Sequence, residues 1–322
     1  MTSSPRAVLS SLVGLCLLVA IIILAKDSLD GELAHQTLWH IMVQLQLPLI
    51  LTAALVGAGL SVSAATLQVT LHNPLADPGI IGISSGASLM AAVVLLLFPS
   101  SDINYFYLLP VACFIGALCS TWLIYMVARR LQASATAVIL AGIAISTVAG
   151  AAIAWLYLLA DAQALRNLTF WLMGSLHQTD WWILAVAGPI ILLSLSYQIF
   201  HSKTLNWLYG GSTLAAAAGA EPSRLVRNNL IVCALGVGAC VSIAGSIAFV
   251  GLLVPHFLRM LIGYDNRTLL PACALTGALV LLLVALCSEL TSWMTLPVSM
   301  VTATIGGPLL LLALYKGQWK MS

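Results

Sequence analysis

Residues 47–70 read LPLILTAALVGAGLSVSAATLQVT, a stretch that contains no charged side chain. The charge-free region around it extends from Glu32 to Asp77. A helix of this length crosses a bilayer core of ~30 Å. Backbone N–H and C=O groups in lipid must find partners within the protein, and the apolar run is continuous rather than alternating. The stretch therefore predicts a transmembrane helix.

The composition of the whole chain agrees with this interpretation. Hydrophobic residues make up 61% of the 322 residues and charged residues only 7%, whereas a soluble domain carries roughly 25% charged residues. Such a chain cannot cover itself with a water-compatible surface. The net charge of +2 is too small to indicate a nucleic-acid partner. We expect an all-α integral membrane protein that lies in the lipid bilayer.

Apolar runs that could cross the membrane occur at 7–25, 47–70, 79–98, 107–128, 136–160, 181–200, 229–252, 268–289 and 296–315, with a further short helix at 255–264. The positive-inside rule favours ten spans with both termini in the cytoplasm, because only Lys26 and Arg166 among the basic residues then lie outside. Trp181 and Trp182 at a span end are typical of an interfacial aromatic belt. We predict about ten transmembrane helices in one bundle, a single domain over residues 1–322.

The sequence contains no motif that would supply the energy for transport. No acidic residue lies near the centre of a span, which argues against proton coupling, and no GxxxxGK[ST] motif is present to bind ATP. An ATP-independent transporter, facilitative or sodium-coupled, is one possibility; a partner ATPase is the other. His35 and His40 do not have the spacing of a helical metal pair, and carboxylates are too few for acid–base chemistry. We therefore predict no enzyme activity, catalytic residue, metal site or cofactor in this chain.

The longest loop rich in small residues lies at about 201–228. Ser212 is a favourable N-cap, the four alanines that follow Leu214 are strong helix formers, and Gly219 is a natural helix stop. A helix this short is unstable alone because nucleation is costly, so it needs a surface to pack on. That surface is either the protein's own bundle or another subunit.

Several further motifs occur in a fixed order between residues 45 and 315. They are LVGAGL (55–60), Gln68, NPLADPGIIGISSGA (73–87), FWLMGSL (170–176), the 208–220 loop, GSIAFVGLLVPHFLR (245–259), NRTLLP (266–271), Leu296-Pro297 and GGP (306–308). Together they resemble the permease subunits of the FecCD type, which import ferric siderophores, haem or cobalamin in bacteria. The segment 245–259 is the most specific of them.

The resemblance implies a subunit of the bacterial cytoplasmic membrane that dimerises with an identical or related permease around a central translocation path. It implies a periplasmic binding protein that delivers an iron chelate, haem or corrinoid, and alternating access driven by two cytoplasmic ATPase subunits that hold ATP and magnesium. It places a cytoplasmic gate at Ala133 and Ser134. The ATPase-coupling positions are Leu208, Gly211, Ser212, Ala216, Gly219 and Ala220.

Four polar residues are candidates for the translocation path, each with a structural alternative. Gln68 either faces the path or hydrogen-bonds a neighbouring helix. Asn73 lies with Asp77 in a proline-rich turn, which Asn and Asp before proline favour. His256 and Arg259 follow Pro255, and they either contribute to the path or belong to a turn that starts the short helix.

The sequence departs from the family pattern at the positions expected to dock the binding protein. Gln46, Leu49 and Ser288 stand where the family usually has arginines, and Val284 replaces the usual aspartate. Those arginines are expected to pair with glutamates of the binding protein, and such pairs mainly set encounter rate and orientation. The binding protein has lost its glutamates too, or the chain is half of a heterodimer whose partner keeps the arginines, or the system is degraded.

Overall fold

The computed structural model describes residues 5–26, 35–79, 81–98, 105–130, 135–291 and 296–315, and the regular secondary structure in this part of the chain is helical throughout. The predicted gate residues Ala133 and Ser134 lie outside the described residues. The elements are α1 (Pro5–Lys26), α2 (His35–Ile41), η1 (Met42–Gln46), α3 (Leu47–Thr70), α4 (Ile83–Leu97), α5 (Tyr105–Arg130), α6 (Ala135–Tyr157), α7 (Ala162–Leu172), α8 (Trp181–Phe200), α9 (Ser202–Tyr209), α10 (Ser212–Ala217), α11 (Pro222–Ala244), α12 (Val250–Ile262), α13 (Asn266–Leu290) and α14 (Val298–Tyr315).

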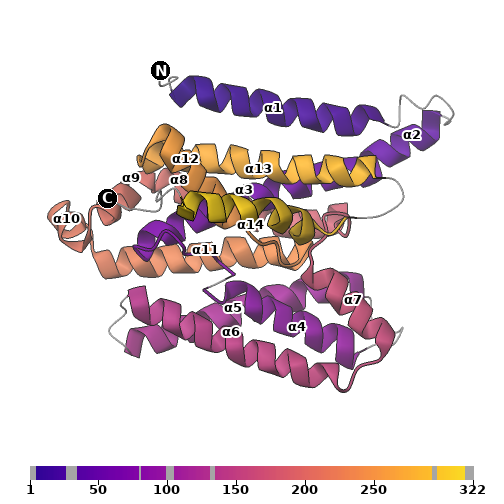
Figure 1. Ribbon diagram of the computed structural model, residues 1–322, viewed down its shortest axis with the longest axis horizontal. Helices are drawn as coiled ribbons and strands as arrows, with labels where there is room; N and C mark the ends of the chain where they lie inside the picture. The colour runs from indigo at the N-terminus through magenta and orange to yellow at the C-terminus, as the bar shows by residue number, and fades with distance from the viewer. Residues whose placement is uncertain are drawn as a thin grey trace.

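The long helices lie side by side in one bundle (Figure 1). The short helices α9 and α10 lie at one end, which we call the coupling-loop end, and α2 and α7 lie at the opposite end, which we call the α7 end. Helix α1 begins at the coupling-loop end and α14 runs back towards it. The 201–228 loop and the 161–180 segment therefore belong to opposite sides of the membrane.

The number of membrane-crossing helices agrees with the ten predicted spans. Seven segments are long and apolar enough to cross a membrane. One of them is the continuous helix formed by α2, η1 and α3, and the other six are α1, α5, α6, α8, α11 and α13. Three shorter apolar helices, α4, α12 and α14, bring the total among the described residues to ten. The protein is an all-helical membrane protein, as predicted.

Two boundaries in the predicted spans were wrong. The span expected at 229–252 is α11, which begins at Pro222 and ends at Ala244, because Gly245 has a φ of 70° and leaves the helix. The short helix expected to begin at Pro255 begins at Val250 instead, and Pro255 lies inside it. The continuous hydrophobicity of residues 229–254 conceals this break, because apolar residues continue through it.

Helix α7 was not expected in the polar segment 161–180. It forms because the side chain of Asp161 accepts a hydrogen bond from the Ala164 N–H at 2.8 Å, a typical N-cap. Buried Ala164, Leu168 and Trp171 attach one face of the helix to the bundle. The spacing of these three residues is that of an amphipathic helix.

Helices α3 and α13 make the most extensive helix–helix contact in the bundle. Gly57 and Gly277 face each other so closely that a Cβ built on Gly277 would lie 2.2 Å from the Gly57 carbonyl oxygen. Small residues allow such an approach in lipid, where dispersion forces rather than the hydrophobic effect hold helices together. The backbones of α3 and α13 therefore lie in direct contact at this pair.

Two buried amide side chains within the spans hydrogen-bond to a neighbouring helix. Gln198 of α8 donates to the hydroxyls of Ser194, at 3.0 Å, and of Ser63 in α3, at 3.4 Å. Asn229 of α11 donates to Thr70 of α3 at 3.0 Å. Helix α3 is thus hydrogen-bonded to α8 and α11 as well as packed on α13, which makes it the central helix of the bundle.

Substitution of Gly277 by alanine should force α3 and α13 apart, because no real Cβ approaches a carbonyl oxygen to 2.2 Å. Overpacking of this kind costs about 1–3 kcal/mol. We expect Gly277→Ala to lower the thermal unfolding midpoint in detergent. The matched control is Gly14→Ala in α1, where a Cβ meets nothing within 4 Å. Equal midpoints for the two variants would contradict the proposed contact.

Candidate functional site

The coupling-loop end is organised around α9, which is anchored on two sides. On one side, the ring Nε2 of His72, in the turn after α3, lies 3.0 Å from the carbonyl oxygen of Leu208. Leu205 and Leu208 are buried beneath the helix. On the other side, the rings of Tyr209 and Tyr264 stack with centroids 5.7 Å apart.

Asn206 of α9 ties this helix to the start of α13. Its Nδ2 donates to Asp265 Oδ1 at 2.7 Å, and its Oδ1 accepts from the backbone N–H of Asn266 at 2.9 Å and from the Asn266 side chain at 2.8 Å. Partial burial raises the pKa of Asp265, but hydrogen bonds from Asn206 and Arg267 outweigh it and hold this pKa below the ordinary value. We call these hydrogen bonds of Asn206 the Asn206 clamp. The ionised Asp265 stabilises the clamp at pH values above the ordinary aspartate pKa, and this stabilisation is lost as the pH falls through the lowered pKa.

Helix α10 forms over the residues predicted for it. Its end is a Schellman motif: Gly219, with a φ of 84°, donates to Ala216 O and Ala220 donates to Ala215 O. The predicted N-cap was one residue too late, because Gly211 (φ 102°) is the N-cap and Ser212 is the first helical residue. A φ of 102° is readily adopted by glycine and not by serine, which explains why Gly211 takes this position.

The exposure of α10 distinguishes it from the rest of the coupling-loop end. Ala215 is buried, whereas Ser212, Leu214, Ala216 and Gly219 are exposed. The helix therefore packs on its own bundle through one small side chain and presents the remaining surface outward. The helix does rest on its own bundle, and the docking of this loop on another subunit stays a prediction.

The break between α11 and α12 is held in place by hydrogen bonds to two other segments. Ser299 Oγ donates to Ser246 O at 2.6 Å, and Thr302 Oγ1 donates to Ala248 O at 3.0 Å, both from α14. The backbone of the 173–175 turn bonds to Ala244, Val298 and Ser299. Irregular backbone at membrane depth is tolerated only when it is satisfied in this way or lines a cavity. The motifs 170–176 and 245–259 thus form one structural unit with the start of α14.

The four candidate path residues occupy different surroundings. Gln68 is fully buried, and its Oε1 accepts a hydrogen bond from Arg259 Nη1. Arg259 also donates to Ala65 O at 3.3 Å, so α12 is bound to α3. His256 also lies on α12 and is buried, with 7% of its surface exposed. Asn73 lies in the turn after α3, where its Oδ1 accepts from Leu75 N at 2.9 Å.

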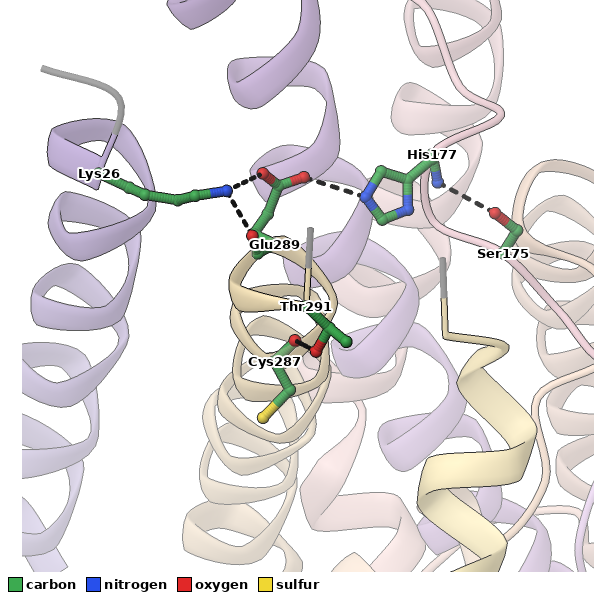
Figure 2. Close-up of polar contacts among 6 residues, drawn as sticks. All are labelled: Lys26, Ser175, His177, Cys287, Glu289 and Thr291. Carbon is green, nitrogen blue, oxygen red and sulfur yellow. Dashed lines mark hydrogen bonds and ion pairs between the residues drawn. The ribbon is translucent and has the colours of Figure 1, made fainter. Parts of the chain in front are cut away.

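At the α7 end, three elements meet through a charged cluster (Figure 2). Lys26, the last residue of α1, lies 3.3 Å from Glu289 Oε2 and also donates to the Glu289 carbonyl oxygen. The ring Nε2 of His177, before α8, lies 3.1 Å from Glu289 Oε1. The backbone N–H of His177 donates to Ser175 Oγ at 3.3 Å. The three side chains are partly exposed. This cluster joins α1, α13 and the α7–α8 connection.

The three positions expected to dock the binding protein lie at the α7 end. Ser288 is the sequence neighbour of Glu289. Gln46 and Leu49 are at the start of α3 and Ser288 is in the last turn of α13. All three are buried, with 3%, 4% and 8% of their surfaces exposed. In this chain, none of them offers a charged side chain to a partner.

Comparison with known families gives the architecture a name. The model of the FecCD transport family matches residues 5–316. The chain belongs to the FecCD transport family. This match confirms the resemblance that the ordered motifs indicated.

Individual relatives resemble the FecCD chain over most of its length. It is 37% identical to the hemin transport system permease protein HmuU of Yersinia pestis, over 91% of this chain and 92% of that protein. It is 38% identical to the vitamin B12 import system permease protein BtuC of Vibrio cholerae serotype O1, over 92% of this chain and 87% of that protein. A solved structure assigned to the metal-chelate type of ABC transporters, in an inward-facing conformation, superposes with a TM-score of 0.88, at 32% identity over 97% of this chain and 99% of that one.

The FecCD chain is thus a multi-pass permease, the transport component of an ABC importer rather than a catalytic subunit. Such an importer implies ATPase and binding-protein partners. The family indicates no cofactor in the permease itself. The alternative of an ATP-independent transporter is set aside by this membership.

Some functional residues were missed in the sequence. Asn206 was not singled out in the loop, and Asp265 before Asn266 is recognisable from the sequence only as an N-cap of its own helix. His72 directly precedes the turn predicted at Asn73 and was not singled out, because its partner Leu208 lies far along the chain. Both residues matter through contacts distant in sequence, for which no local pattern exists.

Loss of the Asn206 side chain should loosen α9 from α13 without unfolding the bundle. We expect Asn206→Ala to speed amide hydrogen exchange in α9 by about tenfold, since hydrogen bonds to a charged group contribute roughly 1.5–3 kcal/mol. The control is Thr204→Ala, whose hydroxyl bonds only to His201 O next to its own helix, at 2.7 Å. Unchanged exchange in Asn206→Ala would show that α9 is held by its apolar contacts instead.

Proposed function

We propose that this FecCD permease carries an iron chelate, haem or corrinoid from the periplasm to the cytoplasm. It does so as one of two permease subunits around a central path, in the bacterial cytoplasmic membrane with both termini in the cytoplasm. The substrate class is supported by the relatives named for hemin and vitamin B12. The orientation is supported by the placement of the basic residues, which the positive-inside rule assigns to the coupling-loop end.

The observation that carries the coupling part of the proposal is the exposed surface of α10. Ser212, Ala216, Gly219 and Ala220 would contact an ATPase subunit, while Gly211 and Leu208 set the angle and depth of the loop. Small side chains allow a close approach of a partner's surface, and the Schellman end keeps this six-residue helix ordered before a partner binds. Two ATPase subunits would serve the two permeases.

Movement at α10 would reach the transport path through α9. His72 connects α9 to the turn that contains Asn73, and Asn206 connects it to α13. The Arg259–Gln68 hydrogen bond then joins α12 to α3. We assign Gln68, Asn73, His256 and Arg259 to the region that responds to this movement, and the cytoplasmic gate to Ala133 and Ser134. A buried cation in a membrane helix is costly and often functional.

Docking of the binding protein is proposed at the α7 end. Because Gln46, Leu49 and Ser288 are buried and uncharged, docking by arginine–glutamate pairs would require another subunit. A heterodimer whose second permease keeps the arginines would supply these charged docking residues. A binding protein with altered docking residues, or a degraded system, are the other two explanations.

The function is tested by purifying the complex from its native membrane, identifying its subunits by mass, and reconstituting it in vesicles. ATP-dependent accumulation of ferric siderophore, haem or cobalamin would establish the substrate class. A second permease in the complex would establish the heterodimer. Accumulation of none of the three under conditions where the ATPase turns over would refute the proposed substrate class.

A charge placed on the exposed face of α10 should block ATPase association. We expect Ala216→Glu to insert in the membrane normally and to reduce ATPase co-purification by at least tenfold, because burying an unpaired carboxylate in an interface costs several kcal/mol. Ala162→Glu, at an exposed position at the start of α7, is the control and should retain the ATPase. Full retention by Ala216→Glu would place the coupling surface elsewhere.

A further inference from the structure

A cavity of about 550 Å³ lies at the α7 end, behind α7 and among α4, α5, α8 and α11. One part of its wall is polar, with Asp161, Gln163, Asn167 and Gln178. The side chains of Gln163 and Asn167 bond to each other at 3.1 Å. Nothing in the coupling or path regions described above uses this cavity.

A second, apolar groove of about 260 Å³ lies beside it between α5, α8 and α11. Pro110, Ile183, Ser242 and Ile243 line both spaces, so the two are adjacent. On α8 the groove follows Trp182, Val186 and Ile190, which are spaced four residues apart and lie on one helix face. Their spacing corresponds to about 12 Å along the helix axis. The groove therefore extends along α8 beside the polar cavity, and its lining is almost entirely apolar.

The groove opens on the outer surface of the bundle. Trp182 is 74% exposed and Val186 is 68% exposed. Tyr107 of α5 also lines the groove, and together with Trp182 it marks the level of the membrane interface, where tryptophan and tyrosine are enriched. The polar cavity thus lies at headgroup level and the apolar groove at acyl-chain level.

The charge of the cavity selects among lipids. Among the residues that the structure describes, Asp161 is the one charged residue that lines it, and its Oδ1 is fixed by the bond from Ala164 N–H. A carboxylate at this position repels an anionic headgroup and attracts an ammonium group. Phe170 and Trp171 also line the cavity, and aromatic rings favour cations. The amides of Gln163, Asn167 and Gln178 supply N–H donors suited to a phosphate.

We propose that this cavity and groove form a binding site for a phospholipid with an amine-bearing headgroup, of the phosphatidylethanolamine type. The headgroup amine lies near Asp161, the phosphate near the side-chain amides, and one acyl chain in the groove beside Val186. A bound lipid would fix α7 against α8, and α7 in turn carries the 173–175 turn that holds the break before α12.

The test is native mass spectrometry of the purified full-length chain in mild detergent, titrated with phosphatidylethanolamine or phosphatidylglycerol of identical acyl chains. We expect the wild-type chain to retain phosphatidylethanolamine preferentially. Asp161→Asn preserves the N-cap, since Asn caps as well as Asp, but should lower the preference about tenfold. Equal retention of the two lipids by the wild-type chain, or an unchanged preference in Asp161→Asn, would overturn the proposal.

The groove is tested separately by filling it from the outside. Val186→Trp should reduce retention of both lipids, whereas Leu193→Trp, at a position 72% exposed on the same helix, should not. Equal loss in both variants would indicate unspecific surface lipid. Disulfide-linked pairs of Val186→Cys chains would show that a second copy covers the groove and would also overturn the proposal. None of these readouts needs transport, so the lipid site and the importer function can fail independently.

Discussion

Backbone groups that lie away from water must be paired within the protein, and the arrangement of this bundle depends on how that requirement is met where a helix stops. Between Ala244 and Val250 the chain leaves its helix inside the bundle. The hydroxyls of Ser299 and Thr302 and the turn at 173–175 supply the missing partners. Three segments far apart in sequence are therefore one hydrogen-bonded unit, and α12 cannot shift without breaking these bonds or moving the start of α14 with it.

The coupling-loop end is connected to the most tightly packed helices. Helix α9 bonds through His72 to the end of α3 and through Asn206 to the start of α13. These same two helices meet at Gly57 and Gly277 with almost no space between their backbones. If the proposed ATPase contact at α10 is correct, a force applied there would reach two helices that must move together rather than a single helix.

The helix count, the α10 helix and the family could be predicted from the sequence because they depend on local patterns: continuous apolar runs, small helix-forming residues before a glycine, and ordered motifs. The break at Gly245 could not, because hydrophobicity continues through it and only the hydroxyls of α14, more than fifty residues later, make it tolerable. The Arg259–Gln68 bond was half visible, since the sequence raised the possibility that Gln68 bonds a neighbouring helix. The Asn206 clamp was invisible, because its partners lie about sixty residues away and no spacing rule joins them.

The ion pair between Lys26 and Glu289 has a consequence for how the protein is made. The two residues are 263 positions apart, and α1 packs mainly against α13, with Cys16 bonding to the carbonyl of Leu275. When α1 leaves the ribosome, the surface on which it will rest has not been synthesised. Helix α1 must therefore remain in the lipid until α13 has been made, and its long apolar run from Leu12 to Ala25 is stable there without a protein partner. The contact between α1 and α13 can form only late in synthesis, although α1 itself is made early.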